Sequence, residues 1–220
     1  ERLKRVMTPI EFANEYEAGF EIASGTVYPE LESCLISESE WLKHWEDNSS
    51  KDKGGVHKRD SWQRVGGMDF GWNDPYCCLS GYLDTDNILW IVNERYIRNA
   101  LLKSHVEYLD NTYRYYCDTA GRQQMQELIS LGFNCMGVYK GIYLVINILT
   151  QLIREGKIKI IRERVPNTIR ESLSYCYAVD SDGDPTGRPV DSNNHALDAL
   201  RYLCVGIKDG NRIPGLVLIG

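Results

Sequence analysis

The amino-acid sequence predicts an α/β fold in which a mixed central β-sheet is flanked by helices. Residues 62–70, 75–83 and 87–96 are successive strand-like runs, and the turn-forming residues 84–87 join the last two into a hairpin. From residue 101 onward, helical stripes alternate with short apolar runs, as expected where helices connect the strands of a sheet. The 220 residues, 43% of them hydrophobic, suffice for one well-buried domain and an appendage.

The first sixty residues differ in composition from the rest. They hold 8 Lys+Arg against 13 Asp+Glu, whereas residues 61–220 hold 17 against 18, so most of the net charge of −6 is N-terminal. A short helix is expected over residues 39–45, capped by Ser37 or Ser39. Residues 48–60 are polar and rich in Gly, Ser and Lys, which predicts a flexible loop. The expected divisions are an acidic linker region 1–60, a folded domain 61–208 and a C-terminal tail 209–220.

The predicted domain continues with alternating helices and strands. An apolar stripe predicts a helix over residues 101–112, and the strand-like run after it ends at Asp118. The further expected elements are a helix at 122–131, a strand at 133–138, a helix at 142–155, a strand at 157–162, a helical segment at 168–178, a turn-rich loop at 179–193 and a helix at 194–207. In this order the first and fourth strands can lie side by side, with the last helix packed across the sheet.

Composition excludes two classes of protein. The longest apolar stretches, such as residues 142–149, are far shorter than the roughly 20 residues that a bilayer crossing needs, so no membrane partner is expected. The seven cysteines include no Cys-x-x-Cys pair, which argues against a zinc cluster and favours a reduced, intracellular protein. Because the sequence does not begin with Met, we expect it to be a piece of a longer chain.

Three aspartates lie where local pattern predicts an element to end or turn inward. Asp69 follows the apolar run of the first strand, Asp118 ends the fourth, and Asp198 lies in the last helix. His195, three residues before Asp198, projects from the same helix face. Carboxylates brought together from distant elements make an oxygen-ligand site for Mg²⁺ or Mn²⁺. The alternative for each aspartate alone is a turn former or a helix cap.

Other polar residues in these segments have a structural interpretation. Asp74, beside Pro75, is interpreted as a turn residue, and Asp191 as a residue that caps the loop before the last helix. Loop 179–193 precedes that helix, and we hypothesise that it covers the site.

Four short motifs occur in order along the chain. They are Gly67-Met68-Asp69-Phe70-Gly71-Trp72-Asn73-Asp74-Pro75, Tyr116-Cys117-Asp118, Tyr139-Lys140-Gly141-Ile142 and His195-Ala196-Leu197-Asp198-Ala199-Leu200-Arg201-Tyr202. Together they resemble the nuclease domain of the large terminase subunits of tailed bacteriophages, over about residues 62–207. The resemblance implies a ribonuclease H-like fold of the integrase superfamily. It also implies a metal-dependent endonuclease that cuts concatemeric viral DNA into genome units during packaging.

The resemblance assigns roles to the four candidate residues. By matching position, Asp69, Asp118, His195 and Asp198 are the catalytic metal ligands. Two Mg²⁺ or Mn²⁺ ions can activate a water and stabilise the leaving oxygen of a phosphodiester. The expectation is that Asp69 bridges the ions, while Asp118 and the His195/Asp198 pair hold one each. Because family members vary at the last motif, either His195 or Asp198 can be the direct ligand here.

The resemblance also implies partners and a location. Double-stranded DNA is the substrate, the small terminase subunit and the portal protein are partners, and the host-cell cytoplasm, at the procapsid portal, is the location. The chain has no Gly-x-x-x-x-Gly-Lys-Ser/Thr phosphate loop, so it is not the packaging motor by itself. Residues 1–60 are therefore interpreted as a linker and the end of a preceding terminase ATPase domain.

Basic residues in the second half of the chain are candidates for phosphate contacts, which carry affinity but no sequence information. The alternative is a solvated surface. The residues predicted to bind DNA are Lys140, Lys157, Lys159, Arg162 and Arg164.

Two other functions remain open from the sequence. One is another ribonuclease H-like nuclease, of resolvase or transposase-like type. The other is a module that docks to DNA or the portal and has little activity alone.

Overall fold

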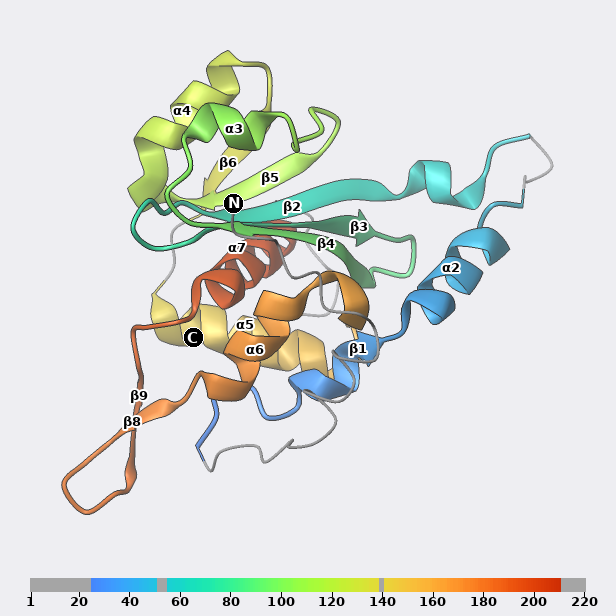
Figure 1. Ribbon diagram of the computed structural model, residues 1–220. Helices are drawn as coiled ribbons and strands as arrows, with labels where there is room; N and C mark the ends of the chain where they lie inside the picture. Colours follow the sequence, from blue (N-terminus) through green and yellow to red (C-terminus); the bar gives the residue numbers. More distant parts are fainter. Residues whose placement is uncertain (1–24, 51–54, 139–140, 211–220) are drawn as a thin grey trace, which may run out of the picture.

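A computed structural model describes residues 25–50, 55–138 and 141–210. Its centre is a seven-stranded sheet in the order β1-β7-β4-β3-β2-β5-β6 (Figure 1). The strands are β1 (Leu35–Ile36), β2 (Gln63–Asp69), β3 (Tyr76–Leu83), β4 (Leu89–Ile97), β5 (Arg114–Asp118), β6 (Asn134–Val138) and β7 (Ile158–Ile161). Strands β2, β3 and β4 form the antiparallel meander, and the other pairings are parallel. The predicted mixed sheet is confirmed, including the contact between the first and fourth predicted strands, β2 and β5.

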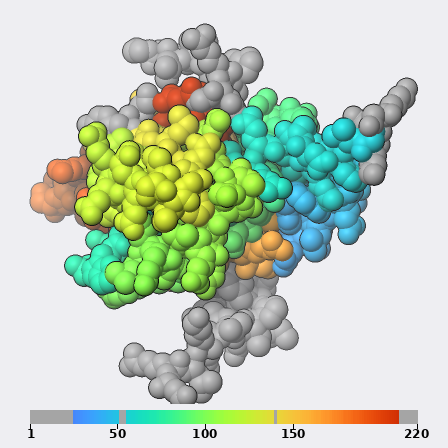
Figure 2. Space-filling model, turned by 90° about the horizontal axis from the view of Figure 1, so that it is seen from above, coloured from blue at the N-terminus to red at the C-terminus, as the bar shows by residue number. Residues whose placement is uncertain are grey.

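Helices cover both faces of this sheet. They are α2 (Glu38–Asp47), α3 (Leu102–Val106), α4 (Arg122–Ser130), α5 (Ile142–Arg154), α6 (Pro166–Ser174) and α7 (His195–Gly210), with short 3₁₀ turns η1 (Leu31–Cys34), η2 (Lys58–Ser61), η3 (Thr119–Gly121) and η4 (Arg162–Arg164). Helices α3 and α4 lie on one face and α5, α6 and α7 on the other (Figure 1). Seen from above, the surface on this side is formed mostly by the green-to-yellow part of the chain, which includes α3 and α4 (Figure 2).

Each face has its own hydrophobic core because β-strand side chains alternate between the two faces. Leu149 of α5 and Leu203 of α7 are buried in the larger core, under the face that α7 crosses. Met125 and Leu128 of α4 are buried in the smaller core on the opposite face. Helix α7 packs against β2, β3 and β5, so it crosses the middle of the sheet.

Part of the acidic N-terminal region joins the same sheet. Strand β1 pairs in parallel with β7, and Trp41 of α2 is buried against Trp62 and Trp90. Ser37 is the N-cap of α2 in a capping box with Glu40, which confirms one of the two predicted caps. Residues 31–47 are therefore packed with the domain predicted at 61–208, while the predicted division of a longer protein stays a prediction.

Two predicted elements differ from the structure. The helix expected over residues 101–112 is only α3, Leu102–Val106. The chain turns after it because the Asp110 carboxylate accepts hydrogen bonds from both the backbone N–H and the hydroxyl of Thr112, a local alternative to continuing the helix. The helical segment expected at 168–178 is α6, which begins earlier, with Pro166 in its first turn, and ends at Ser174.

The segment expected to be a loop at 179–193 supplies the turn and the second strand of a two-stranded hairpin, β8 (Tyr177–Val179) and β9 (Pro185–Pro189). The Asp180 carboxylate accepts hydrogen bonds from the backbone N–H groups of Asp182 and Asp184, and Gly183 has a φ of 88°. The same turn-forming residues that predicted a loop therefore close a hairpin. In the part of the chain that the structure describes, no helix has the length and apolarity needed to cross a membrane.

Candidate active site

Asp69 and Asp118 end neighbouring parallel strands. Asp69 is the last residue of β2 and Asp118 the last of β5, and the register pairs Met68 with Cys117, one residue before each aspartate. Both carboxylates therefore emerge at the same edge of the sheet. The Asp118 side chain also accepts a hydrogen bond from the backbone N–H of Ala120 at 3.1 Å, which caps the turn η3. The cap predicted as an alternative role thus coexists with the position at this edge.

The first turn of α7 brings His195, the first residue of the fourth motif, to Asp69. His195 Nδ1 lies 2.9 Å from Asp69 Oδ2, and the two side chains are 18% and 15% exposed. The approach is close because β2 carries Gly67 under the helix: a Cβ at that position would lie 2.0 Å from the carbonyl oxygen of Ala199. A small residue on the strand therefore lets the helix lie near enough for this hydrogen bond.

Asp198 lies one turn further along α7 and is held by an arginine. Arg201 Nε donates to Asp198 Oδ1 at 3.0 Å, and Arg201 Nη2 donates to the same oxygen. The Arg201 side chain is fully buried and that of Asp198 is 19% exposed. Asp198 therefore has a compensating charge of its own, unlike Asp69, whose partner is a histidine.

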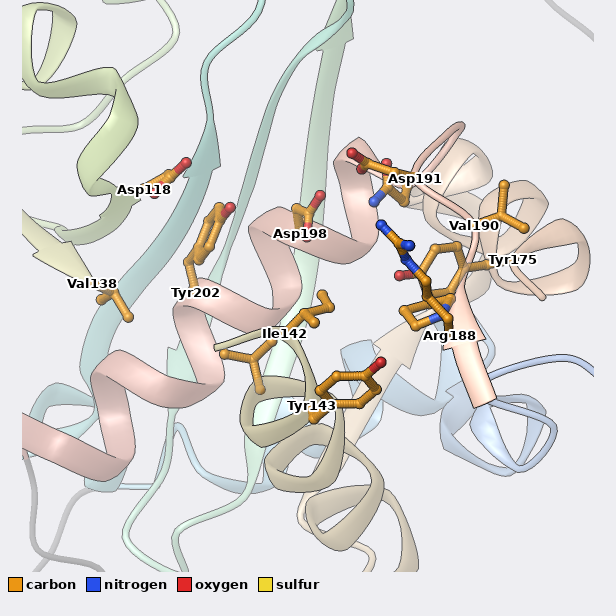
Figure 3. A pocket seen from close by; sticks show the side chains of 13 residues that line it. Asp118, Val138, Ile142, Tyr143, Tyr175, Arg188, Val190, Asp191, Asp198 and Tyr202 are labelled. Atoms are coloured by element: carbon orange, nitrogen blue, oxygen red, sulfur yellow. The ribbon is translucent and has the colours of Figure 1, made fainter. Parts of the chain in front are cut away.

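A cavity of about 570 Å³ opens beside these residues (Figure 3). Asp118 and Asp198 line it together with Tyr202 of α7. Arg188 and Asp191, from the end of the β8–β9 hairpin and the connection to α7, line its other side in Figure 3. The remaining lining residues are Val138, Ile142, Tyr143, Val145, Tyr175, Pro189, Val190 and Asn194. The predicted capping residue Asp191 thus borders the same cavity as two of the predicted ligands.

Burial acts against the charged forms of two carboxylates of the site, Asp69 and Asp198. Burial raises the pKa of Asp69 to about 6; the hydrogen bond from His195 opposes this rise, and the charges of Asp198 and Asp118 add to it. Burial also raises the pKa of Asp198, although Arg201 acts in the opposite direction. The hydrogen bond with Asp69 raises the pKa of His195 against the effect of its burial. A group of carboxylates that resists ionisation for these reasons favours a bound cation.

The donor set suits a hard divalent cation, because carboxylate oxygens are the preferred ligands of Mg²⁺ and Mn²⁺. Within the described residues, however, no three His, Cys, Asp or Glu side chains already stand at the spacing of a metal-ligand set. Asp69 is engaged by His195 and Asp198 by Arg201. The side chains have the chemistry of ligands for a divalent cation and lie at one edge of the sheet. They have to rotate before they can bind the same ion.

A buried glutamate that the sequence did not single out supports the start of α7. Glu171 of α6 is 1% exposed. Its Oε2 accepts hydrogen bonds from the backbone N–H groups of Ala196 and Leu197 at 2.7 and 3.3 Å, and its Oε1 accepts from the Tyr96 hydroxyl at 2.7 Å. Glu171 therefore satisfies first-turn donors of α7 from another helix. No local pattern distinguishes such a cap, because donor and acceptor are 25 residues apart.

Tyr202 and Arg188 also line the site, and the sequence assigned neither of them a role. Burial, and then the charges of Asp198, Asp118 and Asp69, raise the pKa of Tyr202. Arg188 belongs to a segment predicted as loop, where its side chain had no assigned direction. The only signal for Tyr202 was its place one turn after Asp198 on the same helix.

Four of the residues predicted to bind DNA lie elsewhere. Lys157 immediately precedes β7, Lys159 belongs to β7, and Arg162 and Arg164 belong to η4. None of these four lines the cavity of Asp118 and Asp198. Two are engaged locally, Lys157 with the carbonyl of Asp86 and Arg164 with Glu38. Their role in DNA binding stays a prediction.

Two further sequence predictions concern single residues. Lys140 lies outside the described residues. Asp74, interpreted as a turn residue, lies in the turn between β2 and β3, and its Oδ1 is 3.8 Å from His195 Nε2. With 75% of its side chain exposed, Asp74 is a peripheral neighbour of the site.

Solved structures share this fold. The nuclease domain of the large terminase of bacteriophage SPP1, with bound Mn, is 24% identical, with a TM-score of 0.59, over 80% of this chain and 97% of that one. The P22 large terminase nuclease domain is 18% identical over 82% and 91%, with a TM-score of 0.59. That of thermophilic phage G20c, with bound magnesium, is 16% identical over 83% and 98%, with a TM-score of 0.59. The predicted ribonuclease H-like fold is thereby confirmed.

The similarity to known proteins is low in sequence and extensive in structure. The sequence matches no protein-family model and, at a significant level, no curated protein. The three solved nuclease domains are all less than 25% identical to this chain, yet each is matched over at least 91% of its own length. The chain thus has the fold of large terminase nuclease domains.

Proposed function

We propose that this chain is the metal-dependent DNA endonuclease domain of a phage large terminase, which cuts concatemeric double-stranded DNA during genome packaging. The proposal is supported above all by the position of four motif residues at one edge of the sheet in a fold shared with terminase nucleases. Asp69 and Asp118 end neighbouring strands, His195 contacts Asp69, and Asp198 lines a cavity with Asp118. Relatives of this fold contain Mn, magnesium or cobalt. The chemistry of the carboxylates supports the same class of ion here.

The four residues would share the work of holding Mg²⁺ or Mn²⁺, in one or two ions. Bound divalent ions supply an activated water and compensate charge on the leaving oxygen of a phosphodiester. Asp69 would be the ligand shared by the ions, and Asp118 and a residue of α7 would supply the other protein ligands. The hydrogen bond from His195 Nδ1 to Asp69 favours an orienting role for His195, which leaves Asp198 as the α7 carboxylate ligand. Such outer hydrogen bonds fix ligand orientation at metal sites.

The wider setting follows from the same proposal. A nuclease of this family would act on double-stranded DNA in the host cytoplasm, at the procapsid portal. A terminase ATPase domain, the small terminase subunit and the portal protein would be its partners. The hypothesis that the segment at 179–193 covers the site also stays a prediction, and such a cover would restrain cleavage. It is supported by Arg188 and Asp191, which line the cavity.

The direct test is cleavage of supercoiled plasmid by wild-type protein and by the Asp118→Ala variant. We expect nicking and linearisation in Mn²⁺ or Mg²⁺, none in EDTA, and none with the variant, because Asp118 supplies a ligand oxygen. A gel resolves the plasmid forms, and circular dichroism confirms that both proteins are folded. No cleavage by a folded wild-type protein would contradict nuclease activity of this chain and favour the docking module.

The basic residues at β7 and η4 give a second test. Strand β7 runs in the direction of β2 and is three strands from it, about 14 Å at the usual strand spacing. Arg162, which follows β7 at the edge where β2 ends, is thus within the width of a duplex bound at the site, whereas Lys157 lies at the opposite edge, beside Asp86. Replacing Lys157, Lys159 and Arg162 with Ala is expected to lower the slope of log affinity against log salt by roughly 0.9 for each phosphate that is no longer neutralised. Fluorescence anisotropy with labelled duplex in EDTA measures this slope.

The matched control for this measurement is Arg64→Ala. Arg64 is half-exposed and ion-paired with Asp110 near the opposite end of β2, so its loss removes a positive charge away from the site edge. If the triple variant has the same salt slope as the wild type, the prediction that Lys157, Lys159 and Arg162 contact DNA phosphates is wrong.

A further inference from the structure

Arg201 is a buried cation whose partners come from three separate segments. Its side chain is 0% exposed, and its ion-pair partner among the described residues is Asp198. Two of its nitrogens, Nε and Nη2, donate to one oxygen of that carboxylate, Oδ1. Within the part of the chain that the structure describes, no hydrogen bond engages the other oxygen, Oδ2. In Figure 3 the Asp198 carboxylate points to the same side as the Tyr202 hydroxyl.

Two tyrosines complete the surroundings of the guanidinium. Arg201 Nη1 donates to the Tyr28 hydroxyl oxygen at 3.4 Å, and Arg201 Cζ lies 5.1 Å from the ring centroid of Tyr175. The rings of Tyr28 and Tyr175 stack at 6.2 Å between centroids. Arginine interacts favourably with aromatic faces as well as with oxygens, so its orientation is determined on several sides.

Tyr28 reaches this position because residues 25–28 are bound along the base of the β8–β9 hairpin. The backbone N–H of Val27 donates to the carbonyl of Tyr175 at 2.9 Å, and that of Tyr177 donates to the carbonyl of Gly25 at 3.0 Å. Thr26 and Cys176 form an antiparallel bridge between these bonds. The same short ladder therefore holds Tyr28 against Arg201 and fixes the residues that enter the hairpin.

We propose that Arg201 is a positioning residue for Asp198 and that Tyr28, by holding Arg201, makes the segment 25–28 part of the active site. Fixing Oδ1 with two donors sets the plane of the Asp198 carboxylate and leaves Oδ2 for a cation. The inference rests on the proposed function, since it assigns Asp198 to metal binding. It adds that whatever displaces segment 25–28 changes the metal affinity of the site.

A purely structural ion pair is the alternative. Burying an arginine and a carboxylate is costly, and well-packed apolar residues often serve stability as well or better. If the Arg201–Asp198 pair within α7 and the hydrogen bond from Arg201 to Tyr28 only hold α7 and segment 25–28 in place, their removal would affect folding alone. If they orient a metal ligand, their removal would also affect metal binding in molecules that are fully folded. Metal affinity measured beside stability therefore separates the two.

The experiment measures Mn²⁺ binding by isothermal titration calorimetry, in the 220-residue chain, for the wild type, Tyr28→Phe and Arg201→Lys. Tyr28→Phe removes one hydroxyl and keeps the stacked ring, so it is expected to fold. Losing the outer hydrogen bonds of metal ligands costs about 10–100-fold in metal affinity. We expect a loss in this range for Arg201→Lys, which cannot donate from two nitrogens at once, and a smaller loss of about 3–10-fold for Tyr28→Phe, which loses one hydrogen bond.

The control is Tyr115→Phe, which removes another buried tyrosine hydroxyl. Tyr115 packs in the core on the opposite face of the sheet, and its hydroxyl bonds to the backbone of Asp110. Urea unfolding is expected to show a similar loss of stability for Tyr115→Phe and Tyr28→Phe. The Mn²⁺ affinity is expected to be that of the wild type in Tyr115→Phe and lower in Tyr28→Phe.

Two results would overturn the inference, and they differ. If the wild type binds Mn²⁺ and Tyr28→Phe binds it equally well, the Tyr28–Arg201 hydrogen bond is structural and the inference alone fails, whether or not Arg201→Lys folds. If the folded wild type binds no Mn²⁺, the proposed function fails and the inference with it.

Discussion

Asp69→Asn is expected to abolish metal-dependent cleavage and, at the same time, to stabilise the metal-free fold at about pH 8, where the wild-type carboxylate is charged. Asn keeps the shape and a hydrogen-bond acceptor for His195 but removes the charge that holds a cation. Because an outer hydrogen bond alone is worth about 10–100-fold, losing the proposed shared ligand should lower plasmid cleavage by more than about 100-fold. The gain in stability follows from the unfavourable burial of the charged carboxylate.

The direction of the pH dependence follows from the raised pKa values. The pKa of Asp69 is about 6 in the folded protein and 3.8 in the ordinary reference state. Between these values the folded state binds more protons, so the free energy of unfolding falls as pH rises from about 4 to 6 and stays low above it. The pKa of His195 is also raised, which adds stability below its ordinary value of 6.5 that is lost as pH rises further.

Urea unfolding in EDTA at about pH 5 and about pH 8 measures this effect. In the wild type we expect the free energy of unfolding to be lower at the higher pH by roughly 1–3 kcal/mol, and in Asp69→Asn we expect the difference to shrink. The control is Asp110→Asn: hydrogen bonds from Thr112 lower the pKa of this exposed residue below its ordinary value, so the carboxylate stays ionised from about pH 5 to about pH 8. Asp110→Asn is therefore expected to keep the wild-type pH difference and normal cleavage. Full Mn²⁺-dependent cleavage by Asp69→Asn would exclude Asp69 as a ligand.

Gly67→Ala is expected to displace α7 from the sheet and thereby disable the site without touching a candidate ligand. The added Cβ would lie 2.0 Å from the carbonyl oxygen of Ala199 and 2.8 Å from Leu203 Cβ, both on α7. The backbone of the helix has to move, which separates His195 from Asp69. Overpacking of this kind costs typically about 1–3 kcal/mol, and a shift of about 1 Å in reacting groups can lower activity by about 100-fold.

The neighbouring glycine provides a matched control on the other face of the same strand. A Cβ on Gly66 would meet the Tyr115 ring at 2.6 Å and the carbonyl of Leu79 at 2.9 Å, and neither belongs to α7. Gly66→Ala should be destabilised to a similar degree as Gly67→Ala. Its cleavage rate per folded molecule should be higher than that of Gly67→Ala. Equal rates in the two folded variants would show that the seating of α7 on Gly67 does not control the site.

The order of elements and the edge at which the site forms were predictable from local pattern. The meander, the strand ending at Asp118 and the final helix all follow from alternation, helical stripes and turn residues. Once β2 and β5 are parallel neighbours, their last residues must meet. The length of α3 and the β8–β9 hairpin were not predictable, because Asp110 and Asp180 redirect the backbone through side-chain hydrogen bonds that compete with regular structure.

The sequence by itself determined which residues have the chemistry of a metal site, since carboxylates at strand ends and a His three residues from an Asp on a helix are local features. Only the tertiary structure decided how these side chains are held. Arg201 faces Tyr28, and Glu171 caps α7, across separations of 173 and 25 residues. The physical reason is that a buried polar group needs a partner, and which partner it finds depends on the segments that packing brings together.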